Sequence, residues 1–240
     1  MAVKAKAPEP FPGFPPGTLK FLKALGFHQS REWFAENRAL YLADFKEPLE
    51  AYIEALSAEC QRRKLPVKGE ARYASFRLHR DVRFSKNKEP YKTNGGCVLT
   101  RTGRKGSPGI VYTHISPEGG FFAAGFYHPE PHQLLAMRQT IVAKPKAFLD
   151  LEAKLGEAKL EIMDREQLKR VPNTFADCDP RIAHGVRMKN FIVRRAYPDK
   201  LLQDGPKLIA AAADFAQQAA PILKWGWKIL DGLPEPKSQA

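Results

Sequence analysis

The side chains best suited to chemistry in this chain are the cations of one short stretch. Positions 76–92 read FRLHRDVRFSKNKEPYK and hold six Lys or Arg residues against two acids. Guanidinium groups bind phosphate or carboxylate through paired hydrogen bonds, and lysine ammonium groups add point charges. The stretch therefore predicts an anion-binding site. Its candidate anion-binding residues are Arg77, Arg80, Arg83, Lys86, Lys88 and Lys92.

The positive charge of the chain is concentrated around this stretch. The 240 residues carry a formal net charge of +13, and the window from Arg72 to Lys105 holds ten Lys or Arg against Asp81 and Glu89. A surface of this kind attracts nucleic acid, other polyanions or phosphorylated small molecules. Nucleic acid and phosphorylated ligands are therefore the partners that we expect.

Candidates for proton transfer are weaker. Asp81 lies between arginines, which lower the pKa of a carboxyl group, so we expect it to orient the arginines rather than to act as a base. Tyr127 is the other candidate. The six histidines show no HExxH spacing, and no GxSxG, Walker or GxGxxG motif occurs. We expect no metal and no cofactor, and whether the protein is an enzyme stays open.

Aromatic residues among the lysines favour single-stranded nucleic acid, because proteins that bind it combine a basic groove with rings on which bases stack. Phe84 belongs by alternation to the apolar face of its segment, which favours a core position. Tyr91, between Pro90 and Lys92, is the candidate for base stacking.

The elements that must position these residues follow from periodicity. Alternation over 73–84 predicts a half-buried strand. Further strands are predicted at CVLTR and KNFIVRRAY, and IVYTHIS with FFAAGFYH predicts a hairpin. Helical patterns precede and follow them, with a cap at Ser30, a break or kink at Pro48, a helix beginning at Pro145 and an interruption at Pro221. This order predicts an α+β fold with a central antiparallel sheet of about four to six strands, flanked by N-terminal and C-terminal helices.

We expect a proline-rich flexible tail over 1–17, one α+β domain over 18–230 and a flexible tail over 231–240. No stretch is apolar enough for a signal peptide or a membrane span, so we expect a cytoplasmic location and no membrane partner. Cys60, Cys97 and Cys178 are far apart, so we expect them to be reduced and mostly buried.

Five stretches resemble the bacterial and fungal family catalogued as domain of unknown function 2461. They are LKFLKALGFHQSREWFAENRALY, RDVRFSKNKEPYK, GFYHPEPHQLLAMRQ, LKRVPNTFADCDP and KNFIVRRAYPD, and the resemblance covers roughly residues 14–228. It implies no activity, but it adds Arg138, Lys169 and Arg170 to the candidate anion-binding residues. The positions shared with the family pattern also include Arg80, Asp81, Arg83, Phe84, Ser85, Lys88, Pro90, Tyr91, Lys92, Gly125, Tyr127 and Pro129. The chain departs from the pattern at His28, Gln29, His79 and Asn87, none of which is a Lys or Arg.

Three hypotheses remain at this point. The first is a module that binds nucleic acid or another polyanion. The second is an enzyme acting on a phosphorylated or nucleotide-like substrate, with Asp81 or Tyr127 moving protons. The third is a structural or interaction protein in which the cations form an internal ion-pair network. The sequence does not indicate the oligomeric state, the identity of the anion or the role of the proline-rich tail.

Overall fold

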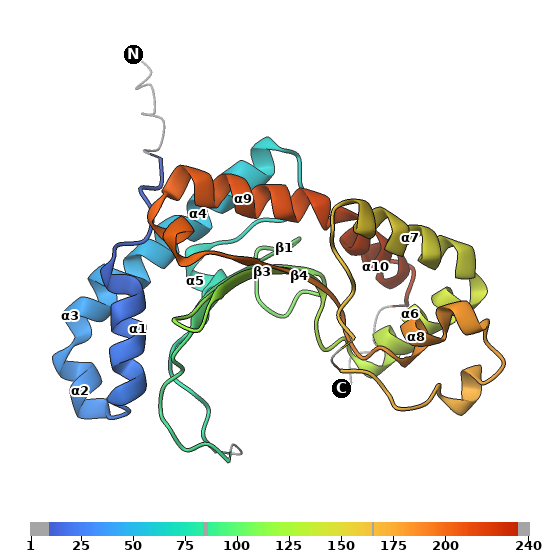
Figure 1. Cartoon of the computed structure of the whole chain (residues 1–240), viewed down its shortest axis with the longest axis horizontal. Coiled ribbons are helices and arrows are strands. Elements are labelled where there is room, and N and C mark those ends of the chain that lie inside the picture. Colours follow the sequence, from blue (N-terminus) through green and yellow to red (C-terminus); the bar gives the residue numbers. More distant parts are fainter. Residues whose placement is uncertain (1–9, 84–85, 165, 235–240) are drawn as a thin grey trace.

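The computed structural model describes residues 10–83, 86–164 and 166–234. In Figure 1 a sheet forms the centre of the molecule, with helices above it and at both ends. The four strands of this antiparallel sheet are β1 (Gly95–Thr100), β2 (Ile110–Ile115), β3 (Gly120–Phe126) and β4 (Phe191–Tyr197), and they lie side by side in that order. The predicted α+β fold is confirmed, and so are the hairpin and the strands at CVLTR and KNFIVRRAY.

Strand register decides which side chains share a face. Tyr112 on β2 lies opposite Val98 on β1 and Ala123 on β3, and Ala123 lies opposite Arg194 on β4. The next row on the same face contains Gly96, His114, Phe121 and Ala196. Because successive side chains point to opposite faces, the intervening residues of β2, Val111, Thr113 and Ile115, point the other way and are buried.

Two long helices cover the face that carries Thr113. They are α4 (Glu47–Arg62) and α9 (Gly205–Gln218), which lie above the sheet in Figure 1. The hydroxyl of Tyr52 on α4 lies 2.9 Å from Thr113 Oγ1, and the ring of Phe215 on α9 packs 5.8 Å from that of Phe122. The main core of the protein therefore lies between these helices and the sheet.

The N-terminal helices are α1 (Gly17–Phe27), α2 (Arg31–Glu36) and α3 (Arg38–Leu40), and a π-helical segment, Tyr41–Lys46, joins them to α4. Ser30 caps α2 as predicted, because its hydroxyl accepts a hydrogen bond from the Trp33 amide. Pro48 lies in the first turn of α4, where its missing N–H matters least, and the regular α-helical pattern begins anew there.

The predicted tail over 1–17 was wrong in its second half. Phe11 and Phe14 are buried, and both rings pack against Tyr52 at centroid distances of 5.7 and 5.6 Å. Burial of two phenylalanine rings offsets the entropy cost of ordering the segment. Residues 1–9 and 235–240 lie outside the described residues, and the single domain over 18–230 stays a prediction.

The C-terminal part contributes α6 (Pro131–Ala143), α7 (Pro145–Glu157), α8 (Ala183–Arg187) and α10 (Ala220–Leu230), at the right of Figure 1. Short 3₁₀ helices occupy Asn173–Phe175, Pro180–Ile182 and Asp199–Gln203. Pro145 and Pro221 lie in the first turns of α7 and α10, as predicted from the sequence. Among the described residues, no helix has the length and apolar character that crossing a membrane requires.

The strand predicted over 73–84 was wrong. The short helix α5 (Ala71–Ala74) occupies its start, and only isolated bridges follow, Ser75 to Cys97 and His79 to Tyr91. Residues 78–80 instead pair with residues 90–92: the Arg80 amide donates to Pro90 O at 2.7 Å and the Lys92 amide to Leu78 O at 2.8 Å. Pro90 has no N–H to extend this pairing. We call residues 76–83 and 86–92 the basic arm; it projects below the sheet in Figure 1.

Candidate functional site

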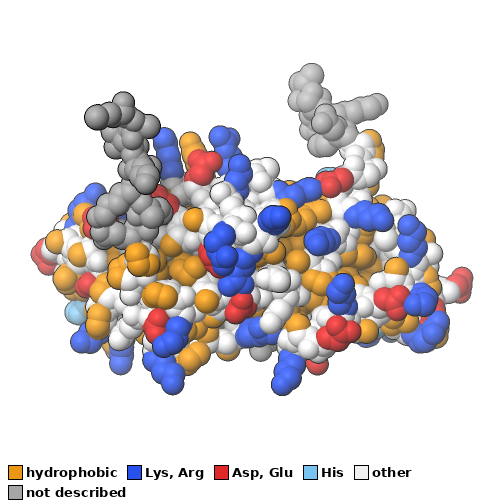
Figure 2. Space-filling view, turned by 90° about the horizontal axis from the view of Figure 1, so that it is seen from above, with side chains coloured by type: hydrophobic (Ala, Val, Ile, Leu, Met, Phe, Trp, Pro, Cys, Tyr) orange, Lys and Arg blue, Asp and Glu red, His pale blue; other side chains and the backbone are white. Residues whose placement is uncertain are grey.

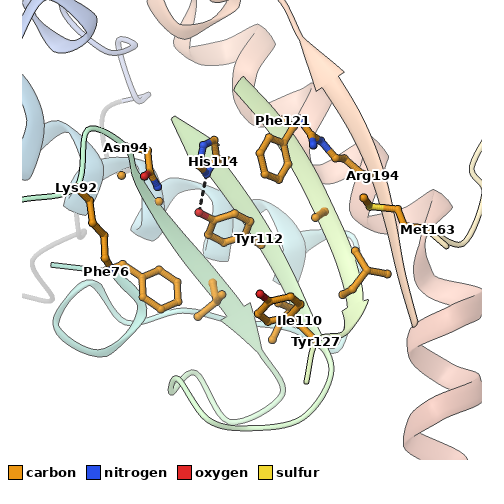
Figure 3. A pocket seen from close by; sticks show the side chains of 15 residues that line it. Phe76, Lys92, Asn94, Ile110, Tyr112, His114, Phe121, Tyr127, Met163 and Arg194 are labelled. Atoms are coloured by element: carbon orange, nitrogen blue, oxygen red, sulfur yellow. Dashed lines mark hydrogen bonds between the residues drawn. The ribbon is translucent and has the colours of Figure 1, made fainter. Parts of the chain in front are cut away.

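The face of the sheet opposite α4 and α9 lines a hollow of about 410 Å³, which we call the sheet groove. Its floor is formed by side chains of all four strands, and the basic arm adds one wall (Figure 3). The floor contains Val98, Tyr112, His114, Phe121, Ala123 and Arg194, and the walls contain Phe76, Lys92, Tyr127 and Met163. The groove is therefore mostly apolar and aromatic, with Arg194 on its floor and Lys92 in its wall.

Small residues between large ones give the groove its depth. Gly96 lies beside Tyr112, and a Cβ at position 96 would lie 2.7 Å from the tyrosine hydroxyl oxygen. Ala123 separates Tyr112 from Arg194 across the strands. Larger side chains at these positions would fill the space that a ligand can occupy, so the hollow depends on which residues the register places together.

The polar group on the groove floor is a tyrosine–histidine pair. The Tyr112 hydroxyl lies 2.9 Å from His114 Nδ1 (Figure 3). Burial lowers the pKa of His114, the positive charge of Arg194 lowers it further, and Glu118 acts in the opposite direction. Burial also raises the pKa of Tyr112. Both groups are therefore uncharged at neutral pH, and they can donate and accept hydrogen bonds without adding charge to the floor.

Phe121 holds this pair in place from the next strand. Its ring stacks on His114 with 4.4 Å between ring centres, and the guanidinium of Arg194 lies over it at 3.6 Å. In Figure 3 the phenylalanine stands between the histidine and the arginine. Because Phe121 contacts both His114 and Arg194, these contacts restrict the side-chain conformations of all three residues at the groove.

A second hollow of about 410 Å³ adjoins the sheet groove, and Phe76 and Lys92 line both. We call it the cationic hollow, because its lining includes Lys46, Arg72, Arg77, Lys92 and Lys105. The Lys105 ammonium group donates to the Ser75 carbonyl at 2.5 Å and lies 5.3 Å from the centre of the Phe76 ring. Burial lowers the pKa of Lys105, and the charges of Arg77 and Lys92 lower it further.

The structure brings together only some of the predicted anion-binding residues. Arg77 and Lys92 meet at the cationic hollow. Arg80 is half-buried, donating to Tyr91 O at 3.2 Å and lying 3.7 Å from Glu89. The other three cations, Arg83, Lys86 and Lys88, are exposed on the arm. Arg83 donates hydrogen bonds to both carboxylate oxygens of Asp81, and the Lys88 ammonium donates to the carbonyl of Val82.

Three further candidates lie elsewhere. Arg138 is on α6, where its guanidinium donates to Met188 O at 3.0 Å, and burial lowers its pKa. Lys169 and Arg170 are exposed in the connection between α7 and α8. These elements lie at the end of the molecule away from the basic arm (Figure 1). The three candidate cations that the family resemblance adds therefore lie away from those of the basic arm.

Tyr91 does not offer a free ring to a base. It is 2 % exposed, and it stacks on Phe34 with 4.6 Å between ring centres and 11° between planes. Its ring fills the space between the arm and the N-terminal helices, so the predicted stacking role is corrected to a packing role. Phe84, predicted to be in the core, lies outside the described residues, as does Ser85.

The two candidates for proton transfer are both exposed. Hydrogen bonds from Arg83 lower the pKa of Asp81, in line with an orienting carboxylate rather than a base. Tyr127 is 60 % exposed and lines the sheet groove. Within the described residues, no three His, Cys, Asp or Glu side chains are grouped so that they can hold a metal ion.

Sequence reasoning missed the floor of the groove. His114, Phe121 and Arg194 were not singled out, although the alternation of IVYTHIS already separates Tyr112 and His114 from Val111, Thr113 and Ile115. That pattern places two polar aromatic side chains on the face opposite the core. The opposite, helix-covered side of the molecule carries Lys and Arg dispersed among acidic and hydrophobic groups (Figure 2).

Comparison with known proteins gives one match. The family described as a conserved hypothetical protein (DUF2461) matches residues 17–225. No curated protein and no solved structure matches the chain.

Proposed function

The chain belongs to the DUF2461 family, and from the geometry of its open sheet face we propose that it binds a small organic anion in the sheet groove. The apolar, flat part of the ligand packs against Tyr112 and Phe121, and its negative charge lies toward Lys92. The observation that carries this proposal is an aromatic hollow that Lys92 and Arg194 also line.

The dimensions of the groove support a small ligand. A hollow of about 410 Å³ falls within the range of roughly 300–1,000 Å³ that is typical of small-molecule sites, which are mainly apolar with a few polar groups that orient the ligand. Here the orienting groups are the Tyr112–His114 pair on the floor and Lys92 at the arm. A neutral pair beside a cation favours a ligand that is polar at one end and apolar at the other.

Binding can be tested with 1-anilinonaphthalene-8-sulfonate, an aromatic anion whose fluorescence rises in apolar surroundings. Ala123→Leu fills the groove floor and should weaken binding by about tenfold or more, since the added side chain takes the place of the ligand. Ala196→Leu is the matched control, because Ala196 is exposed on the same sheet face and does not line the groove. Thermal melts of both variants check that they fold.

An equal loss of dye binding in both alanine variants, or no dye binding by the native protein, would overturn the proposal. The expected pattern is loss in Ala123→Leu and an affinity within about twofold of the native value in Ala196→Leu.

Single-stranded nucleic acid is the second candidate, because exposed cations continue from the groove onto the basic arm at Arg77, Lys86 and Lys88. A strand that neutralises Z phosphates loses affinity with a log-log salt slope near −0.7Z, so roughly six phosphates give a slope of about −4. Polarisation of a labelled oligonucleotide between 50 and 300 mM salt measures this slope. Changing Lys86 and Lys88 to alanine should reduce its magnitude by about 0.7 each if the strand follows the arm.

A further inference from the structure

Three of the five cations that line the cationic hollow are Arg77, Lys92 and Lys105. Arg77 and Lys92 come from the two ends of the basic arm, and Lys105 comes from the loop between β1 and β2. Within the described residues, no ion pair joins any of the three to a carboxylate. The hollow also contains Arg72, whose guanidinium lies 5.5 Å from the centre of the Tyr73 ring, and Lys46, which lies 3.7 Å from Glu50, a carboxylate in the same lining.

Two of these charges act on the third. Burial lowers the pKa of Lys105, and the charges of Arg77 and Lys92 lower it further, which is the direction expected for like charges held close together. Folding places Lys105 there nonetheless, with its ammonium group bonded to Ser75 O and near the ring of Phe76. An anion in the hollow would turn this repulsion into attraction toward all three groups.

The hollow and the sheet groove adjoin each other. Phe76 and Lys92 form their common boundary, since both residues line both spaces. A ligand can therefore place a charged group among the three cations while its apolar body lies over Tyr112. In this arrangement Phe76 lies between the charged group of the ligand and the part of the ligand that packs on the groove floor.

We propose that the ligand is a phosphomonoester of a flat aromatic group, of the nucleoside monophosphate class, with its phosphate bound by Arg77, Lys92 and Lys105 and its ring system in the sheet groove. This inference rests on the proposed function, that the groove binds a small organic anion. It adds the chemical class of the anion and assigns Lys105 to the site.

A phosphomonoester fits this arrangement better than a carboxylate does. It offers three oxygens and carries about −1.5 to −2 charge at pH 7, whereas a carboxylate offers two oxygens and one charge. Three cations in one hollow match three acceptors, and an arginine guanidinium such as that of Arg77 can bind two of them at once.

The test compares the four common nucleoside 5′-monophosphates with the corresponding nucleosides by isothermal titration calorimetry. At least one monophosphate should bind about tenfold or more tightly than its nucleoside. Lys105→Gln and Arg77→Gln should each weaken monophosphate binding by about tenfold while nucleoside affinity stays within about twofold. Lys154→Gln, which removes an exposed charge on α7, should change neither affinity.

Two outcomes would overturn the phosphate assignment and leave the proposed function standing. In the first, naphthalene-sulfonate binding depends on Ala123 while monophosphates bind no better than nucleosides, or not at all. In the second, oligonucleotides bind and monophosphates do not, which favours the single-strand candidate. Dye binding that Ala123→Leu does not weaken would instead refute the groove itself, whatever the calorimetry gives.

Discussion

The guanidinium of Arg194 lies over the ring of Phe121, with 3.6 Å between the guanidinium carbon and the ring centre. The two residues come from adjacent strands, and the arginine on β4 lies opposite Ala123 in register. Contact between a cation and an aromatic face is stabilised by the ring quadrupole, by about 0.5–1 kcal/mol at exposed positions. The contact also holds the positive charge of Arg194 near His114, which lies on β2, on the other side of β3.

Replacing Arg194 with Gln should raise the pKa of His114, because the charge that helps to keep the imidazole neutral is removed. Nuclear magnetic resonance titration of the histidine ring protons measures the change. Arg195→Gln is the matched control, since Arg195 points to the other face and binds Gln218 and the Ala158 carbonyl. A His114 pKa that moves equally in both variants would contradict the assignment.

The lowered pKa of His114 also predicts how stability depends on pH. As pH falls through the ordinary histidine pKa of about 6.5, His114 binds a proton in the unfolded chain. In the folded protein its pKa is lower, so it stays neutral at that pH. The free energy of unfolding should therefore fall with acidification, starting near that pH. His114→Gln should show a shallower decline between pH 7.5 and 5.5 in urea denaturation. Parallel pH profiles for the two proteins would count against this origin of acid sensitivity.

Gly125 should tolerate no side chain. Its φ is +131°, and a Cβ there would lie 1.9 Å from the carbonyl oxygen of Phe191 on β4. Gly119 has a similar φ of +120°, but nothing lies within 4 Å of the position that its Cβ would take. Both alanine variants carry backbone strain of about 1–3 kcal/mol. Gly125→Ala should lose at least about 2 kcal/mol more, because only it clashes with the neighbouring strand.

Urea denaturation of the two glycine variants measures that difference. Equal losses would show that the β3–β4 pairing can shift to accept a side chain at position 125.

The three cysteines should differ in reactivity. Cys60 and Cys97 are buried, and burial raises the pKa of each thiol to about 12, so little thiolate is present at neutral pH. Cys178 is only half-buried. With a thiol reagent such as dithionitrobenzoate, the native protein should show one fast-reacting thiol and the denatured protein three. Fast reaction of a Cys178→Ser variant would contradict this.

Local pattern was enough to predict much of the fold. The alternation in IVYTHIS indicated β2, because a strand with one buried face must alternate. KNFIVRRAY also predicted a strand, β4, although Phe191, Ile192 and Val193 are buried in succession rather than in alternation. Pro145 and Pro221 marked helix starts, since proline fits the first turn and disrupts the interior. The alternation of 73–84 failed as evidence for a sheet strand, because the segment meets β1 at Ser75 and Phe76 and then pairs with residues 90–92.

The sequence by itself determined the charge of the basic arm, the α+β order of elements and the exposure of Arg83 and Lys86, since these depend on composition and neighbours along the chain. Only the tertiary structure decided that Tyr91 is packed on Phe34, and that Arg77, Lys92 and Lys105 meet beside an aromatic groove. Strand register placed His114 against Phe121 and Ala123 against Arg194. Such contacts depend on which distant backbones pair and at what offset, and a shift of one residue would turn every one of these side chains to the other face.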